Sequence, residues 1–439
     1  MQLVWRFGNR SVTWEITLYN DVMDILLTIL AATIVLGFLV FIHEGGHFLA
    51  ARAFGVRVSE FMIGLPGPHV GVQRGETKFG VTAIPLGGYA RVCGMEPGEM
   101  SPYLEAAMAS VYARGTAVME DVALDCGCTD DEAYEALEEL VEWGTVLGPK
   151  KTDEYNVYRV PARKPTALQM KRAHRRGFKG AQFAEERVSE HDLDAAVPVQ
   201  VAGSAAKTSE MAATGTVDGK LNVNVSSCRV LEEGVPAPLD DPHEAFLAEY
   251  RQQYRSLPAW KRMAILLAGP GVNLLFAMLA FVIIYSVLGF DYQNTETGEI
   301  SHIVVSPLRA IEAGFMYIAM VVQAVMGLFN PQTAAETVSN STSVVGIAVM
   351  SKSAFEAGLT SVLSFTAMLS VSLGVMNLLP IPPLDGGRFV IEVYQRIRRK
   401  VVGVRAMNYL SFAGMALFML FFIIMMNQDI QRFIFGNWG

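Results

Sequence analysis

The sequence contains little charge and little cysteine for its length. Charged residues make up 18% of the 439 residues, hydrophobic residues make up 51%, and the mean hydropathy is +0.31. This balance argues against an ordinary soluble protein and favours a membrane protein. The four cysteines form no recognisable disulfide framework; they are Cys93, Cys126, Cys128 and Cys228. Cys126 and Cys128 lack a partner pair, so we expect reduced structural cysteines rather than a metal site.

A cleavable signal sequence is also not recognisable. The first apolar run begins near residue 24, has no small-residue cleavage site and continues directly into a His-Glu motif. We therefore expect this run to remain in the mature protein as a membrane span.

Four apolar segments are long enough to cross a bilayer, which takes about 20 residues. They cover residues 24–46, 263–289, 358–380 and 407–426. A fifth run, Phe315 to Phe329, is shorter and carries Gln323. We favour a helix in the membrane interface or packed on the bundle for this run, with a true span as the alternative. The expected fold class is an α-helical polytopic membrane protein with about four transmembrane helices.

Basic residues are concentrated in two of the loops. Residues 159–179, between the first and second spans, contain eight Lys and Arg, and residues 396–405, between the third and fourth, contain five. The stretch between the second and third spans holds only Arg309 and Lys352. The positive-inside rule then places the two basic loops in the cytoplasm and both termini outside.

The run from His43 to His47, His-Glu-Gly-Gly-His, lies near the cytoplasmic end of the first span. Ionisable residues at that depth cost about 2.5 kcal/mol or more each, so they persist there mainly for function. His43 and His47 share one face of a helix, which presents two imidazoles to one metal ion, and Glu44 is placed to accept a proton from water. We interpret the run as a zinc site. The alternative, two histidines that only pack between helices, leaves Glu44 unexplained.

A catalytic zinc ion needs a third protein ligand and one open position. Asp385 follows a span that runs from outside to inside, and so reaches the depth of the two histidines. The prolines before it break the helix, and non-helical backbone at that depth must be buried or line a cavity. Asp385 alone would be assigned as a helix cap; beside a buried HExxH motif we favour the zinc ligand.

These motifs together resemble the site-2 proteases, and most closely their bacterial RseP-like branch. The resemblance covers residues 24–95 and 256–430. The segments that carry it are His43–His47, Ile84–Tyr89, Trp260–Arg262, Ala268–Asn273 and Asn377–Gly387.

The resemblance implies zinc held by His43, His47 and Asp385, with Glu44 as general base. It also implies that Asn377 holds the substrate backbone or the oxyanion. The implied reaction is hydrolysis of a peptide bond inside the transmembrane segment of a substrate. The implied location is the bacterial inner membrane, with the active site toward the cytoplasm.

A transmembrane substrate must unwind before its peptide bonds are accessible. Residues 79–91 alternate in polarity and contain Gly87 and Gly88, so we expect a short membrane-associated β-hairpin. Its exposed edge could receive an extended substrate by strand addition, and an ordinary surface hairpin fits equally well. Gly87, Gly88 and Asn273 are the candidate substrate-binding residues.

The chain departs from the RseP-like pattern in several places, and two of them concern whole domains. Only about 65 residues lie between Phe290 and Phe355, and no PDZ-type sequence is recognisable there. An insert at 101–255 stands on the cytoplasmic side instead. Within it, residues 112–160 resemble a winged helix, with a capping box at Thr129 and Glu132.

The helix that would contact DNA in such a fold is acidic, and phosphate binding needs cations. We therefore expect no nucleic-acid partner and favour contact with a cytoplasmic regulatory protein. The basic stretch after it could lie on anionic lipid or be a solvated linker. The expected division is a stub at 1–23, a first span at 24–54, a β region at 55–100, the insert at 101–255 and the remaining spans at 256–439.

Two rival functions are considered. A signalling adaptor with a degenerate protease core would not need His43, Glu44, His47 and Asp385 all intact. A metal transporter would need ionisable residues along a path across the bilayer, and the second and fourth spans contain no Asp, Glu, Lys, Arg or His; Asn273 is the polar candidate that the second span offers. An intramembrane zinc protease is the preferred interpretation.

Overall fold

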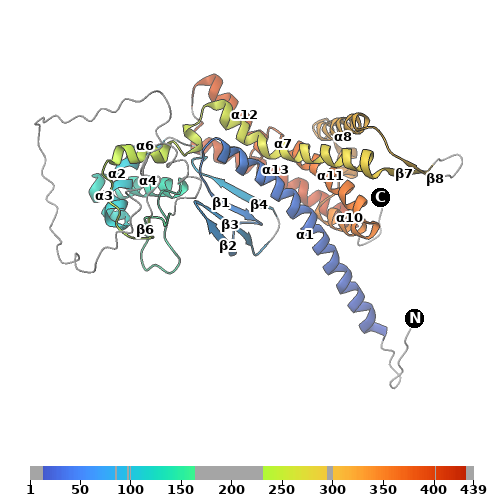
Figure 1. The fold of residues 1–439 in the computed structure, drawn as a ribbon, viewed down its shortest axis with the longest axis horizontal. Helices are drawn as coiled ribbons and strands as arrows, with labels where there is room; N and C mark the ends of the chain where they lie inside the picture. The colour runs from blue at the N-terminus through green and yellow to red at the C-terminus, as the bar shows by residue number, and fades with distance from the viewer. Residues whose placement is uncertain are drawn as a thin grey trace, which may run out of the picture.

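The structure is a computed structural model that describes residues 13–84, 87–95, 98, 100–163, 231–293, 300–400 and 402–431. Four long helices run along its length (Figure 1). They are α1 (Thr13–Ala53), α7 (Ala259–Val282, extended by the π-helix η3, Ile283–Leu288), α11 (Leu359–Asn377) and α13 (Val404–Asp429). Each corresponds to an expected span. An apolar helix satisfies its own backbone hydrogen bonds, which is what a segment in lipid requires.

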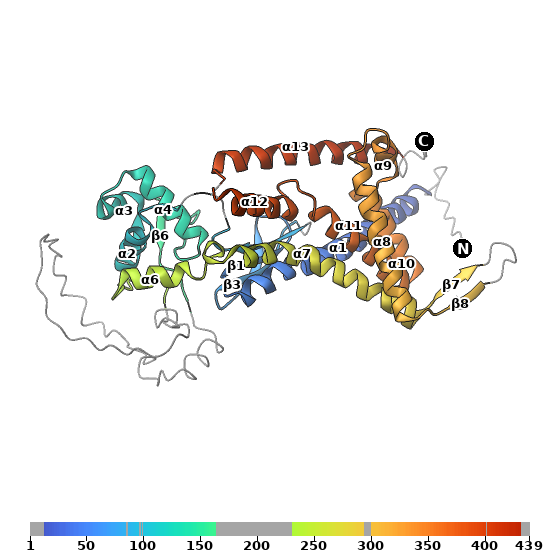
Figure 2. The ribbon, with the colours of Figure 1, turned by 90° about the horizontal axis from the view of Figure 1, so that it is seen from above.

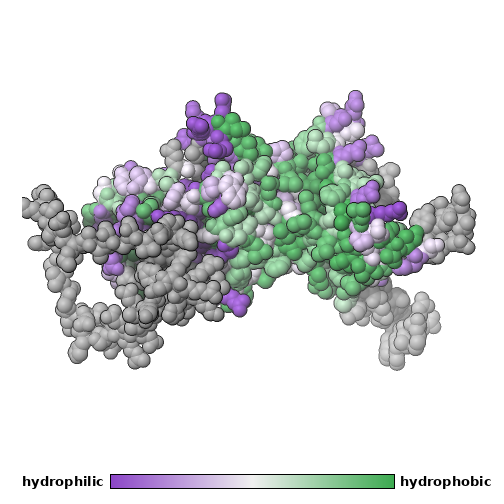
Figure 3. All heavy atoms as spheres, turned by 45° about the horizontal axis from the view of Figure 1, so that its top comes forward, coloured by the Kyte–Doolittle hydropathy of each residue, from purple (hydrophilic) through white to green (hydrophobic). Residues whose placement is uncertain are grey.

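The helical part of the molecule is covered by hydrophobic residues. Figure 3 shows them as a broad band, with hydrophilic residues gathered toward both ends of the long axis. Five of the described helices are long and apolar enough to cross a membrane; they are Met23–Ala53, Ala259–Leu288, Pro307–Gly327, Leu359–Asn377 and Arg405–Asp429.

The fifth of these candidates is α8 (Pro307–Gly327), which contains the run that we assigned to the interface. By length and composition α8 qualifies as a membrane span. The structure therefore has five candidate spans among its described helices, one more than the four expected from the sequence. Figure 1 looks nearly down the axis of α8, whereas Figure 2 shows it running across the direction of α7 and α13. This crosswise direction favours the interfacial placement.

The ends of the long axis carry different structures. The insert lies at one end, and α12 (Asp385–Arg398) follows it toward the middle of the molecule (Figures 1 and 2). The other end carries the hairpin β7–β8 and the short helices α9 and α10, with the starting end of α1 and the final turn of α13 (Figures 1 and 2). The bounds of these elements are Phe290–Gln293, Ile300–Ile303, Ala334–Asn340 and Val344–Ala357.

A four-stranded sheet packs beside the end of α1 that carries the HExxH motif (Figure 1). Its order is β2-β3-β1-β4, with bounds His69–Arg74, Thr77–Thr82, Val58–Ile63 and Gly88–Val92. The expected hairpin at 79–91 is wrong, because β3 and β4 do not pair with each other but flank β1 on opposite sides. The hairpin is β2–β3. The sheet nevertheless leaves β4 as an edge strand.

The insert contains a core of its own. Its described elements are α2 (Leu104–Arg114), β5 (Thr116–Val118), α3 (Met119–Cys126), α4 (Asp130–Glu142), β6 (Val157–Arg159) and α6 (Pro242–Tyr250). The capping box at Thr129 and Glu132 is confirmed, and Leu147 pairs with Arg159 as expected. The core also takes Leu104 and Met108 from α2 and Ala245 from α6, so the unit is wider than 112–160.

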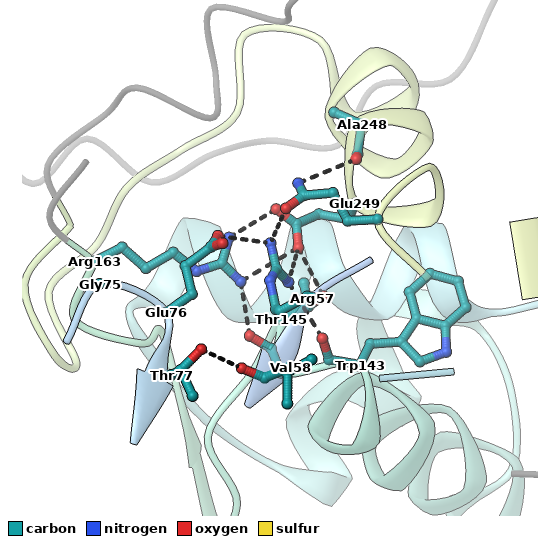
Figure 4. Close-up of polar contacts among 12 residues, drawn as sticks. Arg57, Val58, Gly75, Glu76, Thr77, Trp143, Thr145, Arg163, Ala248 and Glu249 are labelled. Carbon is teal, nitrogen blue, oxygen red and sulfur yellow. Dashed lines mark hydrogen bonds and ion pairs between the residues drawn. The ribbon is translucent and has the colours of Figure 1, made fainter. Parts of the chain in front are cut away.

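A buried cluster of charges joins the insert to the sheet (Figure 4). Arg57, at the start of β1, donates to Glu249 at 2.6 Å and to Glu76 at 3.3 Å. Arg163 donates to Glu249 at 2.7 Å, and the Thr145 hydroxyl donates to the same carboxylate at 2.9 Å. Because Arg57 is only 2% exposed, these contacts fix the insert against the strand that follows the HExxH helix.

Three of the four cysteines lie in the described part of the chain. Cys93 is buried, Cys126 and Cys128 are partly buried, and all three are free thiols, as expected. Most of the basic stretch that begins at Arg159 lies outside the described residues. Its two described arginines do not face lipid: Arg159 pairs with Asp153 at 2.7 Å, and Arg163 lies in the buried cluster.

Candidate metal centre

The two histidines of the HExxH motif lie on one face of α1. His43 and His47 are each 7% exposed, and their Nε2 atoms lie 3.4 Å apart. The face that carries them packs against α7. A Cβ at Gly269 of α7 would lie 2.2 Å from His47 Nε2, so only glycine permits this approach. The fit of α1 against α7 therefore sets where the imidazoles point.

Asp385 reaches the histidines from the beginning of α12. Its Oδ2 atom lies 3.1 Å from His43 Nε2 and 3.2 Å from His47 Nε2. The two glycines after Asp385 pack against the backbone of the segment that precedes it. A Cβ at Gly386 would lie 2.2 Å from Leu378 O, and one at Gly387 would lie 2.3 Å from Pro382 N, so this close packing requires glycine at both positions. Nitrogen and oxygen atoms of two histidines and one aspartate thus converge on one point, as the sequence predicted.

The second nitrogen of each imidazole tests whether the site fits a metal ion. His47 Nδ1 lies 2.8 Å from the carbonyl oxygen of Ile265, so Nδ1 carries the proton and Nε2 keeps a free lone pair. His43 Nδ1 lies 3.1 Å from Asn273 Nδ2, while Asn273 Oδ1 is buried without a hydrogen-bond partner. The oxygen and nitrogen of an asparagine amide are assigned from such contacts and are interchangeable.

Turning the Asn273 amide over gives His43 the acceptor that a metal-bound histidine normally has. Nδ1 then donates to Oδ1, and Nε2 is free to bind a metal. The donor set of two neutral imidazoles and one carboxylate, with the distances above, fits a zinc ion with one open position.

Glu44 faces the sheet from the same helical turn. Its Oε2 accepts a hydrogen bond from the backbone N–H of Ala90 in β4 at 2.9 Å. A Cβ at Gly88 would lie 2.7 Å from Val40 Cγ1 and 3.6 Å from Glu44 Cγ, so β4 approaches α1 closely at this glycine. The carboxylate of Glu44 is thereby held between the histidines and the edge strand.

Of the other predicted site residues, Asn377 and Asn273 lie beside His43, whereas Gly87 lies at the end of the sheet. The side-chain nitrogen of Asn377, at the end of α11, lies 3.4 Å from His43 Nε2 and thus beside the three converging atoms. Gly87 accepts from Gly64 N at 2.8 Å at the end of the sheet. Asn273 is fully buried against His43 rather than open to a substrate, so its position favours a role in orienting the histidine.

Sequence reasoning missed three contributors to the site. The carbonyl of Ile265 and the N–H of Ala90 are backbone groups, and no side-chain pattern identifies them. Gly269 had a signal, since it stands in the Ala-Gly-Pro-Gly run of the second span, where a glycine before proline marks a close approach.

Comparisons with known proteins agree with this geometry. The model of the family described as Peptidase family M50 matches residues 31–421. The chain is similar to the Regulator of sigma-W protease RasP of Bacillus subtilis, with 23% identity covering 92% of this chain and 98% of that protein. It is also similar to the Zinc metalloprotease RasP of Geobacillus kaustophilus, with 24% identity covering 94% and 99%. The match spans both histidines, the glutamate and the aspartate, and the chain belongs to peptidase family M50, the site-2 protease family.

Proposed function

We propose that the chain is an intramembrane zinc metalloendopeptidase that cleaves a peptide bond in a transmembrane segment of a membrane protein. His43, His47 and Asp385 hold the zinc ion in this proposal, and Glu44 is the general base. The main support for this proposal is the convergence of the three donor atoms, two from α1 and one from α12. A structural cross-link would not need the glutamate beside the open position, which favours a catalytic site over a purely structural one.

Zinc, when bound, polarises the scissile carbonyl and lowers the pKa of water toward 7. Glu44 then accepts the proton of the attacking water and delivers it to the leaving amine. Its hydrogen bond from Ala90 N keeps the carboxylate aimed at the site before substrate arrives. Asn377 lies within reach of the reacting carbonyl, where its side-chain N–H can stabilise the developing negative charge.

The edge strand β4 is the proposed substrate-binding element. Among the described strands β4 pairs with β1 alone, so its other edge faces no strand. Except at Ala90, whose N–H is bound by Glu44, that edge can pair with an extended peptide. Because Ala90 of this strand contacts Glu44, a peptide paired along β4 passes beside the general base. Gly88 lets the strand lie this close, which is the role we assign to it in substrate binding.

The protein is a multi-pass membrane protein, and we propose the bacterial inner membrane with the insert in the cytoplasm. The Bacillus subtilis relative is named a regulator of sigma-W. An anti-sigma factor, or a remnant signal peptide, is accordingly the substrate class that we propose here. The insert, with its winged-helix-like order of elements and acidic helix α4, is the proposed contact for a cytoplasmic regulatory protein.

The experiment that tests this proposal separates metal binding from catalysis. Glu44→Gln keeps the shape of the side chain and removes the base, so the purified variant should retain zinc and lose cleavage of a transmembrane reporter by about 10²–10⁴-fold. His43→Ala should lose both zinc and cleavage. Normal cleavage by Glu44→Gln would refute the proposed mechanism, and cleavage by neither wild type nor variant, with zinc bound, would favour the adaptor.

A further inference from the structure

A cavity lies where the insert, α7, α12 and α13 meet. Its volume is about 360 Å³. It lies beside the 3₁₀ turn η2 (Tyr254–Ser256) and the first turns of α7, and Figure 1 shows α12 next to this end of α7. None of the proposed zinc ligands lines it.

Three arginines from three different elements line this cavity, which we call the arginine cavity. They are Arg255 of η2, Arg262 of α7 and Arg388 of α12. Glu392 is the one carboxylate among its described lining residues, and it pairs with Arg262 at 3.1 Å. The cavity therefore has a net positive charge over the part that the structure describes.

The three arginines differ in their hydrogen-bond partners. Arg255 contacts Glu139 at 3.0 Å, outside the lining. Arg388 donates to the sulfur of Met95 at 3.2 Å, and a thioether is a weak, neutral acceptor. Of the three arginines, Arg388 is thus the one whose contact is neutral, and its side chain is exposed and open to an anionic ligand.

Apart from Gln395 and the tyrosines Tyr250 and Tyr254, the rest of the lining is glycine and apolar side chains. It includes Leu266, Ile391 and Met407, from α7, α12 and α13. Leu266 and Met407 stand near the beginning of two helices that qualify as membrane spans, so the cavity lies at the level of the membrane surface. With the orientation proposed above, that surface is the cytoplasmic one, where anionic lipids are concentrated. Apolar walls beside guanidinium groups match a phospholipid better than they match a fully hydrated ion.

We propose that the arginine cavity binds the phosphate group of an anionic phospholipid of the cytoplasmic leaflet. Arg388 provides the principal contact, because a guanidinium pairs with phosphate through two parallel hydrogen bonds. Arg255 and Arg262 supply further positive charge, and Leu266 and Met407 contact the glycerol and the first acyl carbons. The bound lipid would join α12, whose first residue is Asp385, to α7 and the insert.

The test uses the full-length protein in nanodiscs that contain phosphatidylcholine with a trace of phosphatidylglycerol, followed by native mass spectrometry of retained lipid. Wild type should retain one phosphatidylglycerol per chain. Arg388→Gln should reduce that retention about tenfold, the effect of losing one charge-assisted contact. Arg396→Gln is the matched control, because it removes the same charge from the same helix at a residue outside the cavity lining.

Three outcomes decide the proposal. Loss of retained lipid in Arg388→Gln alone supports it. Equal retention in both variants would overturn it, since the lipid would then be held by general surface charge. If inorganic phosphate displaced phosphatidylglycerol completely at millimolar concentration, the site would be one for free phosphate and the lipid assignment would be wrong. Zinc content, measured on each sample, separates this result from failure of the proposed protease site.

Discussion

The amide of Asn273 determines which nitrogen of His43 is available to a metal ion. The residue is fully buried, and its side-chain oxygen has no hydrogen-bond partner when the amide nitrogen faces His43. If the oxygen faces His43 Nδ1, that nitrogen is fixed as a donor and Nε2 is fixed as the ligand atom. The residue therefore acts on the metal through the histidine rather than by contact with substrate.

Replacing Asn273 should change zinc affinity in a way that depends on the acceptor. Asn273→Leu removes the side-chain oxygen that accepts from His43 Nδ1. Loss of a hydrogen bond that orients a metal ligand should weaken zinc binding about 10- to 100-fold. Asn273→Asp keeps an oxygen toward His43 and should remain within a few-fold of wild type. Competition with a chelator measures both. A leucine variant with wild-type affinity would contradict this role.

At the scale of the element, the contact between α1 and α7 is the most sensitive to a single methyl group. Gly269 and Gly271 lie on the same helix, but a Cβ at Gly269 would meet His47 Nε2 at 2.2 Å, whereas one at Gly271 would meet nothing within 4 Å. The two glycines thus provide a matched pair.

Gly269→Ala should displace the His47 imidazole and remove most of the zinc, because the new methyl group occupies the place of the ligand ring. Gly271→Ala should retain about one zinc per chain. Metal analysis after purification compares them. Full zinc in Gly269→Ala would mean that α7 can move away from α1 without cost, against the packing described.

The joint between the insert and the sheet depends on Glu249. Burial disfavours its charge, but Arg163 and Arg57 outweigh burial and hold the pKa of Glu249 below its usual range. Because the folded pKa is lowered, the stabilisation is complete above the unfolded value near 4.3 and is lost as the pH falls below it. The joint should hold at neutral pH and weaken in acid.

Glu249→Gln leaves two buried arginines without their shared carboxylate and should lower the free energy of unfolding by about 3–5 kcal/mol. Limited proteolysis between the insert and the sheet should accelerate accordingly. Glu233→Gln is the control: Glu233 pairs with Lys150 on the surface, where such pairs contribute about 0–1 kcal/mol. Equal effects of the two variants would contradict the importance of the buried cluster.

The elements could be predicted from the sequence where the signal is local. Apolar length identified the four long helices, and the Thr129 capping box marked the start of α4. Sheet pairing could not be predicted, because β1 joins β3 and β4 across a separation that no turn residue encodes. The extent of the winged-helix-like unit at 112–160 was predicted too narrowly for the same reason, since α6 packs on α2 from more than 100 residues away. A deletion of 112–160 would cut through their shared core.

The proposed site was predictable because metal chemistry restricts the residue types. Two histidines at helical spacing and one aspartate at the same depth are few enough to find by inspection. The groups that orient them are a backbone carbonyl and an amide on α7, and only the packing of α7 on α1 brings them there.

At the scale of the whole molecule, the two ends of the long axis should face different compartments. Lys151 is exposed in the insert, and Asn330 is exposed between α8 and α9. Figure 2 shows α9 toward the end of the long axis opposite the insert. In a cysteine-free background, Lys151→Cys should be labelled by a membrane-impermeant reagent only in inverted vesicles, and Asn330→Cys only in intact cells. Labelling of both from one side would overturn the proposed topology.

The donor atoms of the proposed zinc site also have a consequence during synthesis. His43 and Asp385 are 342 residues apart in the chain. At about 5–20 residues per second, the ribosome adds the aspartate roughly 20–70 seconds after the histidine. During that interval the growing chain has only two of its three proposed ligands. Hydrolytic competence is deferred until the last helices are made, which spares neighbouring nascent chains from a half-built protease.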